Sequence, residues 1–235
     1  MRESNEEGNN MNKILQSIIV AAGLAVVAVS PAMAQTFSAN ITGTTNYMWR
    51  GISQSSNDPA LQGGLDYDFG NGLAVGTWAS TVDSAGASLE WDIYGSYTTS
   101  FTENLGATFG VIGYVYPDAP GSADSDFVEF YAGPNFTLGI ASVTGRLYYS
   151  PEFGGGLGSM YWTGGISIPF AGILSASANV GYSDSDSGIR DYTDWNIGLA
   201  ASYEFLTLTG MVVGNDLPGS KERFVGMLTA KFSVP

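Results

Sequence analysis

The chain has 235 residues, among them 32 glycines, no cysteine and no histidine, and its formal net charge is −14. Acidity without a basic cluster argues against nucleic-acid binding, and the missing Cys and His remove thiolate catalysis, disulfides, Cys-ligated zinc and the commonest general base. Charged residues make up only 13% of the chain, about half the share of an ordinary soluble domain. We therefore expect no enzyme, no metal site and no cofactor.

The N-terminal region has the pattern of a secretory signal peptide. Lys13 precedes an apolar run over 14–29, and residues 32–34 read Ala-Met-Ala, a typical cleavage site. A transmembrane anchor is the alternative, but the run is short and ends in small residues. We predict a signal peptide with an upstream extension over 1–34, true initiation at Met11, and a mature chain over 35–235.

After this leader, apolar and polar residues alternate along almost the whole chain. For example, Trp195, Ile197 and Leu199 alternate with Asp194 and Asn196. This period of two is typical of β-strands with two different faces. It predicts strands of mostly about ten residues, enough for a tilted strand to cross a bilayer. The expected strands are 37–50, 59–69, 73–82, 89–101, 105–116, 126–136, 140–150, 160–170, 174–183, 193–205, 207–213 and 222–234.

The connections between these strands alternate in length. Short turns are expected at 70–72, 102–104, 137–139, 171–173 and near 206, and longer Gly-, Ser-, Asp- and Pro-rich loops at 51–58, 83–88, 117–125, 151–159, 184–192 and 214–221. Short turns on one side and long loops on the other are typical of an outer-membrane barrel with both termini in the periplasm. The predicted fold class is therefore all-β, a transmembrane antiparallel up-and-down β-barrel of about twelve strands.

Aromatic residues cluster at both ends of the faces that we assign to the outside. Two aromatic rings around an apolar band are the pattern imposed by bilayer interfaces. A soluble sandwich or lipocalin-like barrel is the alternative, but the opposite faces carry Ser, Thr, Asn and Gly rather than the charges of a soluble surface. The short-turn ring is Phe37, Phe69, Phe101, Phe136, Phe170, Phe205 and Phe232, and the long-loop ring is Tyr47, Trp49, Trp91, Tyr149, Trp162, Tyr182, Trp195 and Phe224.

Residues 47–95 carry a family resemblance. The motifs are WRGISQ at 49–54, PALQGG at 59–64, GTWAS at 76–80 and EWDIY at 90–94. In these motifs the chain resembles the TorF-type putative porin family of exported bacterial proteins. The resemblance implies an outer-membrane β-barrel of porin type and supplies no substrate. Many barrel proteins end in an aromatic residue used for assembly, whereas this chain ends in 231–235, KFSVP.

Charged residues on the opposite strand faces are the candidate site residues. Two carboxylate pairs share one face of a strand each, Asp66 with Asp68 and Glu90 with Asp92. Acid–base catalysis is one reading of such pairs, and a lumen charge cluster balanced by arginine and lysine is the reading we favour. The expected pore-lining residues are Arg50, Asp66, Asp68, Glu90, Asp92, Glu129, Arg146, Asp194, Glu204, Arg223 and Lys231.

The loop at 51–58 is the second candidate. Gln54, Asn57 and Asp58 supply hydrogen-bonding groups near the mouth. One reading is a loop that folds inward to pack the lumen, and the other is a constriction or recognition loop. The acidic stretch 184–194 starts like a calcium loop but lacks the Gly and Glu of an EF-hand. We favour a solvated loop, and loose binding of a divalent ion by its carboxylates is the alternative.

A pore is the leading functional hypothesis, because twelve strands are expected to enclose a narrow channel. We expect a bacterial outer-membrane channel for small solutes that prefers cations, since acidic groups dominate the lumen and the long loops. The alternative is a closed structural or adhesive barrel plugged by Tyr94, Tyr114, Tyr116, Tyr131 and the charged pairs. The expected partners are outer-membrane lipid, surface glycolipid, small solutes or ions, and the barrel-assembly machinery, and no nucleic acid.

Overall fold

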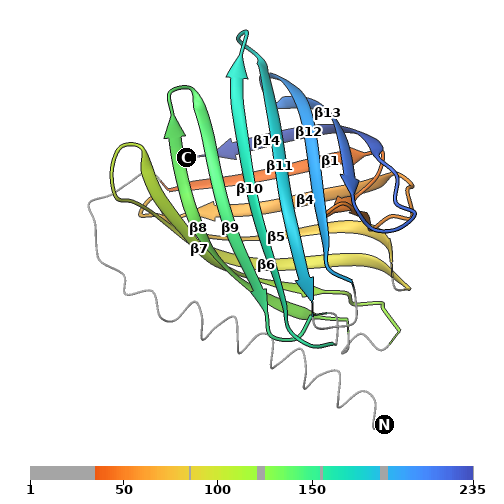
Figure 1. The fold of residues 1–235 in the computed structure, drawn as a ribbon. Helices are drawn as coiled ribbons and strands as arrows, with labels where there is room; N and C mark the ends of the chain where they lie inside the picture. Colours follow the sequence, from red (N-terminus) through yellow and green to blue (C-terminus); the bar gives the residue numbers. More distant parts are fainter. Residues whose placement is uncertain (1–34, 85, 121–124, 154–155, 186–189, 235) are drawn as a thin grey trace.

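A computed structural model describes residues 35–84, 86–120, 125–153, 156–185 and 190–234 (Figure 1). The predicted signal peptide at 1–34 lies outside these residues, as does part of the acidic stretch 184–194. Twelve long strands run through the described residues: β1 Thr36–Thr44, β4 Ala60–Asp68, β5 Leu73–Ser84, β6 Ala87–Ser100, β7 Leu105–Val115, β8 Phe127–Leu138, β9 Ala141–Ser150, β10 Ser159–Phe170, β11 Leu174–Ser185, β12 Tyr192–Tyr203, β13 Leu206–Asn215 and β14 Arg223–Val234.

These strands form a closed antiparallel barrel in which each strand pairs with its neighbours in sequence. Closure joins β1 to β14, with Phe37 opposite Val234 and Thr44 opposite Met227. The register places the start of β1 and the end of β14 at the rim of the short turns, as expected. None of the described residues forms a helix that could span a membrane. The predicted fold class and all twelve predicted strands are confirmed, with most boundaries shifted by one or two residues.

Three predicted boundaries are wrong in ways that matter. The first strand ends at Thr44 rather than at residue 50, and two short strands follow it, β2 Met48–Trp49 and β3 Ile52–Ser53. The expected long loop at 83–88 is a tight connection, because β5 runs on to Ser84 and β6 begins at Ala87. Strand β12 ends at Tyr203, so residues 204–205 form the turn to β13.

The outside of the barrel is apolar. Ile41, Ile197 and Leu199 keep 51%, 61% and 60% of their surface exposed, while the alternate positions Thr42 and Asp194 are buried. A soluble barrel would bury its apolar face instead, so that alternative is excluded. The two aromatic rings lie on this outer face as predicted, with two exceptions, Tyr47 and Trp49, which lie inside the barrel.

Candidate functional site: the segment that crosses the lumen

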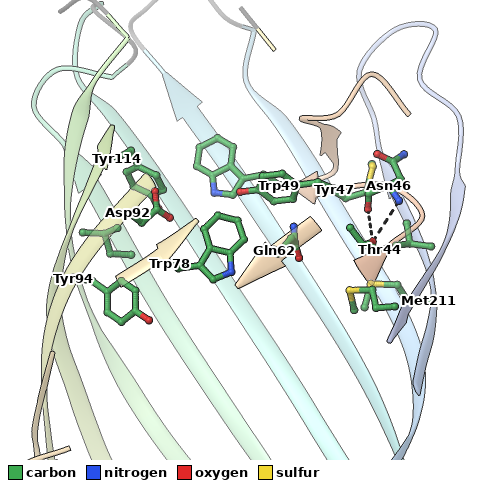
Figure 2. Close-up of a pocket in the computed structure, with 14 residues that line it drawn as sticks. Thr44, Asn46, Tyr47, Trp49, Gln62, Trp78, Asp92, Tyr94, Tyr114 and Met211 are labelled. Atoms are coloured by element: carbon green, nitrogen blue, oxygen red, sulfur yellow. Dashed lines mark hydrogen bonds between the residues drawn. The ribbon is translucent and has the colours of Figure 1, made fainter. Parts of the chain in front are cut away.

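Residues 45–59, which we name the inner loop, leave β1 at the long-loop end and fold back into the barrel (Figure 2). Short polar contacts fix its first turn: the Thr44 hydroxyl donates to the Asn46 carbonyl at 2.9 Å, and the Tyr47 amide donates to Ser55 Oγ at 3.0 Å. The Gln54 amide then donates to the Tyr47 carbonyl at 2.8 Å. These bonds close the β2–β3 hairpin.

The tip of the inner loop reverses at Arg50 and Gly51, both with positive φ (48° and 76°). A Cβ on Gly51 would lie 2.8 Å from the Asp194 Cβ and 3.0 Å from the Gly214 carbonyl oxygen. Only glycine fits such a close approach to the wall. The hairpin tip is therefore packed directly against β12 and β13.

Arg50 fastens the inner loop to the far side of the barrel. Its guanidinium donates to both carboxylate oxygens of Glu129, at 2.8 and 2.6 Å, and the two side chains are only 6% and 1% exposed. Its Cζ also lies over the rings of Trp49 and Tyr161, at 4.2 and 4.1 Å from their centroids. Glu129 is on β8, five strands from β1 around the closed sheet in one direction and seven in the other, so this contact spans the lumen.

Aromatic side chains fill the space around this ion pair. Trp49 packs edge-on against Tyr114 and Phe127 and stacks on Phe153, with centroid distances of 6.1, 6.5 and 5.9 Å. The Tyr114 hydroxyl donates to Glu129 at 3.1 Å. The sequence pattern had placed Trp49 on the membrane side, and the structure makes it part of the lumen core instead.

Tyr47 makes a second connection, to β6. Its hydroxyl donates to Glu90 Oε1 at 2.9 Å, and its ring packs edge-on against Trp78 at 5.5 Å. Glu90 is 1% exposed. The predicted lumen carboxylates Glu90 and Glu129 are thus bound by the inner loop itself.

The predicted loop residues lie toward the mouth. Asn57 Oδ1 accepts from Asn46 Nδ2 at 3.3 Å and from Arg223 Nε at 2.9 Å. Gln54 is half-buried, and Asp58 is exposed with its carbonyl accepting from the Ser55 hydroxyl at 2.6 Å. The inner loop is therefore tied to β14 as well as to the far wall, and the inward-folding reading of 51–58 describes it.

The other predicted site residues are distributed along the wall. Asp66 accepts from the Tyr94 hydroxyl at 2.6 Å, and Asp194 accepts from the Tyr161 hydroxyl at 3.2 Å. Arg146 donates to the Asn135 side chain and to two backbone carbonyls rather than to a carboxylate. Asp68 and Lys231 are exposed near the short-turn rim. Glu204, expected on a lumen-facing strand, is an exposed turn residue with φ 53°, so that placement was wrong.

Below the inner loop, a cavity of about 510 Å³ opens in the lumen (Figure 2). The inner loop forms its roof, and β1, β4, β5, β6, β7, β13 and β14 form its walls. Aromatic and methionine side chains dominate the lining, and Asp92 is the one carboxylate among the lining residues. The lining comprises Thr44, Asn46, Tyr47, Met48, Trp49, Gln62, Trp78, Asp92, Tyr94, Ile112, Tyr114, Met211, Val225 and Met227.

The two halves of the lumen differ. At the long-loop end the inner loop seals a belt of inward side chains, of which Ser80, Glu90, Glu129, Ser150 and Val225 are no more than 2% exposed. At the short-turn end the inward side chains Thr98, Asn179 and Lys231 remain exposed. The structure is thus a barrel narrowed at one end and open at the other.

Outside the barrel wall, Asp118 ties the connection between β7 and β8 to the rim. Its carboxylate accepts from the Ser88 hydroxyl and amide and from the Leu89 amide. The bond from the Ser88 side chain, followed by those from the backbone amides, lowers the pKa of Asp118. The connection is therefore anchored while this carboxylate is charged.

These features place the fold in the class of membrane-type β-barrels. The sheet of twelve strands is closed, its exterior is apolar, and the first loop crosses the polar lumen. The chain belongs to the family described as a bacterial protein of unknown function (Gcw_chp), whose family model matches residues 28–231. The resemblance to TorF-type proteins is not part of that description. No curated protein matches the chain.

Among solved structures, the chain is similar in fold to the KdgM porin. Against KdgM in complex with disordered oligogalacturonate, the TM-score is 0.60 at 12% sequence identity, covering 85% of this chain and 99% of that one. A second KdgM structure gives a TM-score of 0.60 at 11% identity, with the same coverage. At these identities the likeness concerns the fold.

Proposed function

We propose that this protein is a porin-like channel for small solutes in a bacterial outer membrane, with the inner loop as its constriction. The observation that carries the proposal is the inner loop, which crosses the lumen of a closed barrel whose outside is apolar. The shared fold with KdgM and the TorF-type motifs at 47–95 support it. Export through the 1–34 signal peptide and insertion by the barrel-assembly machinery belong to the same proposal.

We further propose that the channel prefers cations. Six carboxylates on lumen faces, Asp66, Asp68, Glu90, Asp92, Glu129 and Asp194, stand against Arg50, Arg146, Arg223 and Lys231. Within the described part of the chain, Arg50 and Glu129 make the one ion pair, so most of these carboxylates are not neutralised by a contacting cation. A low-dielectric wall focuses their field into the opening and concentrates counter-ions there. These residues are the proposed pore lining.

This charge pattern separates the chain from its structural neighbour in solute choice. KdgM was solved with oligogalacturonate, a chain of sugars that each carry a carboxylate. An acidic lumen repels such a polyanion. We therefore propose small neutral or cationic solutes for this channel rather than acidic oligosaccharides.

Planar-bilayer recording of the refolded mature chain tests the channel and its selectivity together. In a KCl gradient we expect a reversal potential that favours K⁺ over Cl⁻, and the preference should fade as salt shortens the Debye length from about 30 Å at 0.01 M to about 3 Å at 1 M. Glu90→Gln with Asp92→Asn should weaken it. Glu103→Gln, in an exposed turn at the short-turn end, is the matched control. Anion preference would contradict the proposal.

The second candidate function is a closed structural or adhesive barrel. The belt of buried side chains at the long-loop end favours it, because Ser80, Glu90, Glu129 and Ser150 are at most 1% exposed. Conductance decides between the two. The Arg50→Met substitution removes the inner-loop anchor. If neither the wild type nor this variant conducts ions, the barrel is closed.

A further inference from the structure

Asp92 is a buried carboxylate without a complete set of partners. It is 8% exposed, lines the cavity beneath the inner loop, and its Oδ1 has no hydrogen-bond partner in the described part of the chain. Figure 2 shows it beside Tyr114, on the wall of the cavity. Burial without a cationic partner disfavours the charged form of a carboxylate, which a proton then neutralises. A bound cation that donates to Oδ1 would stabilise the charged form of Asp92 instead.

The cations of the lumen do not provide that donor. Arg50 is engaged by both oxygens of Glu129. Arg146 donates to Asn135 and to backbone carbonyls, and Arg223 donates to Asn57. Lys231 is exposed near the short-turn rim. The nearest charged neighbour of Asp92 along its own strand face is another acid, Glu90. An external cation in the cavity would satisfy Asp92 where the chain does not.

The rest of the cavity lining fits an organic cation better than a metal ion. Trp49, Trp78, Tyr94 and Tyr114 present aromatic surfaces, which attract cations through the ring quadrupole. Three methionines, Met48, Met211 and Met227, add soft apolar surface. Calcium or magnesium takes six or more oxygen ligands, and this lining does not offer that number of carboxylates or carbonyls. A volume of about 510 Å³ accommodates a small organic ion.

We propose that this cavity is a binding site for primary alkylammonium ions. The ammonium N–H groups donate to Asp92 Oδ1, and the alkyl chain packs among the Trp78 ring and the methionines. A quaternary ammonium has the same charge but no N–H, so it leaves Oδ1 unsatisfied. A neutral sugar supplies donors but leaves the carboxylate charge uncompensated. The inference deepens the proposed function by naming the solute class, although binding itself does not require conduction.

Calorimetric titration of the refolded mature protein in detergent tests the site. The probe is n-butylammonium, and the control is tetramethylammonium, an isomer of identical formula and charge without N–H donors. We expect saturable binding of n-butylammonium that is at least about tenfold tighter than that of its isomer, since hydrogen bonds to charged groups contribute that much. 1-Butanol, the uncharged probe, should not bind measurably.

Variants locate the site. Asp92→Asn should weaken n-butylammonium binding at least about tenfold, whereas Glu103→Gln removes the same charge at a distant turn and should leave binding unchanged. Trp78→Leu should weaken binding because it removes the ring on which the alkyl chain packs, and it serves as the second test if Asp92→Asn does not fold. Equal affinity for the two isomers, binding that survives both lumen substitutions, or no saturable binding would overturn the proposal.

The two proposals fail separately. A protein that conducts in bilayers but gives no n-butylammonium isotherm keeps the channel function and loses this site. A protein that binds n-butylammonium through Asp92 but never conducts keeps the site and loses the channel function. Block of K⁺ current by n-butylammonium, absent in Asp92→Asn, would support both.

Discussion

Replacing Arg50 with Met should release the inner loop from the far wall. The substitution keeps an unbranched stem but removes both hydrogen bonds to Glu129 and leaves that carboxylate 1% exposed and without its cation. Breaking a buried ion pair by removing one partner costs about 3–5 kcal/mol. Because about 1.4 kcal/mol corresponds to a factor of ten, the open population of the inner loop should rise roughly 150- to 5,000-fold. The lower end is expected, since Tyr114 still donates to Glu129.

Hydrogen exchange of the amides in 45–59 measures this opening directly, because Thr45, Gln54 and Asp58 donate backbone bonds that hold the inner loop closed. Exchange should accelerate in Arg50→Met together with an increase in conductance. Removing both charges, with Arg50→Met and Glu129→Leu, should restore much of the protection, since no buried charge is left unpaired.

Arg223→Met is the matched control for the anchor. It removes a single, exposed hydrogen bond to the same inner loop, at Asn57, and should accelerate exchange by at most about tenfold. Unchanged exchange in Arg50→Met, or an effect no larger than that of the control, would refute the anchoring role of Arg50.

Three further predictions concern the two faces of the strands, the signal peptide at 1–34 and the Asp118 anchor. Leu199→Arg should destabilise the barrel in lipid by about 2–4 kcal/mol and Asn196→Arg by much less, measured by urea unfolding in vesicles; equal costs would contradict the assigned faces. N-terminal sequencing of the envelope protein should begin at Gln35, and retention of 11–34 would contradict export. The Asp118 anchor should hold above the ordinary carboxyl pKa and weaken as acid lowers the pH through its depressed pKa; exchange of the Ser88 amide should follow this pH dependence, and Asp118→Asn should abolish it.

The barrel itself was predictable because a bilayer imposes a simple alternation of apolar and polar residues on each strand. Outward residues such as Ile197 and Leu199 must be apolar and inward ones such as Asn196 face water, so the alternation of the sequence reports the pleat directly. Even β13, whose two faces are similarly apolar, was placed to within two residues at each end, because the connections on either side bound it.

The inner loop was not predictable in the same way. Tyr47 and Trp49 continue the alternation of β1 without a break, so the pattern carried the strand six residues too far. Their rings are equally suited to a membrane interface and to a lumen core. The distinguishing feature is tertiary: Arg50 finds Glu129, which is 79 residues away in sequence. The length of the predicted strand, fourteen residues, gave no warning, because β6 is a genuine strand of the same length.

The attachment points of the inner loop affect the order in which the barrel assembles. Its partners include Glu129 in the middle of the chain and Gly226 near its end, the latter through the Thr45 amide at 2.9 Å. The inner loop follows β1, the first strand to be synthesised, yet β14, the last strand, supplies part of its binding surface. Contacts this distant in sequence form late, because loop closure must precede them. The wall of the barrel should therefore form first, and the inner loop should reach its final position only when β1 pairs with β14. A narrowed lumen then indicates a barrel that has closed.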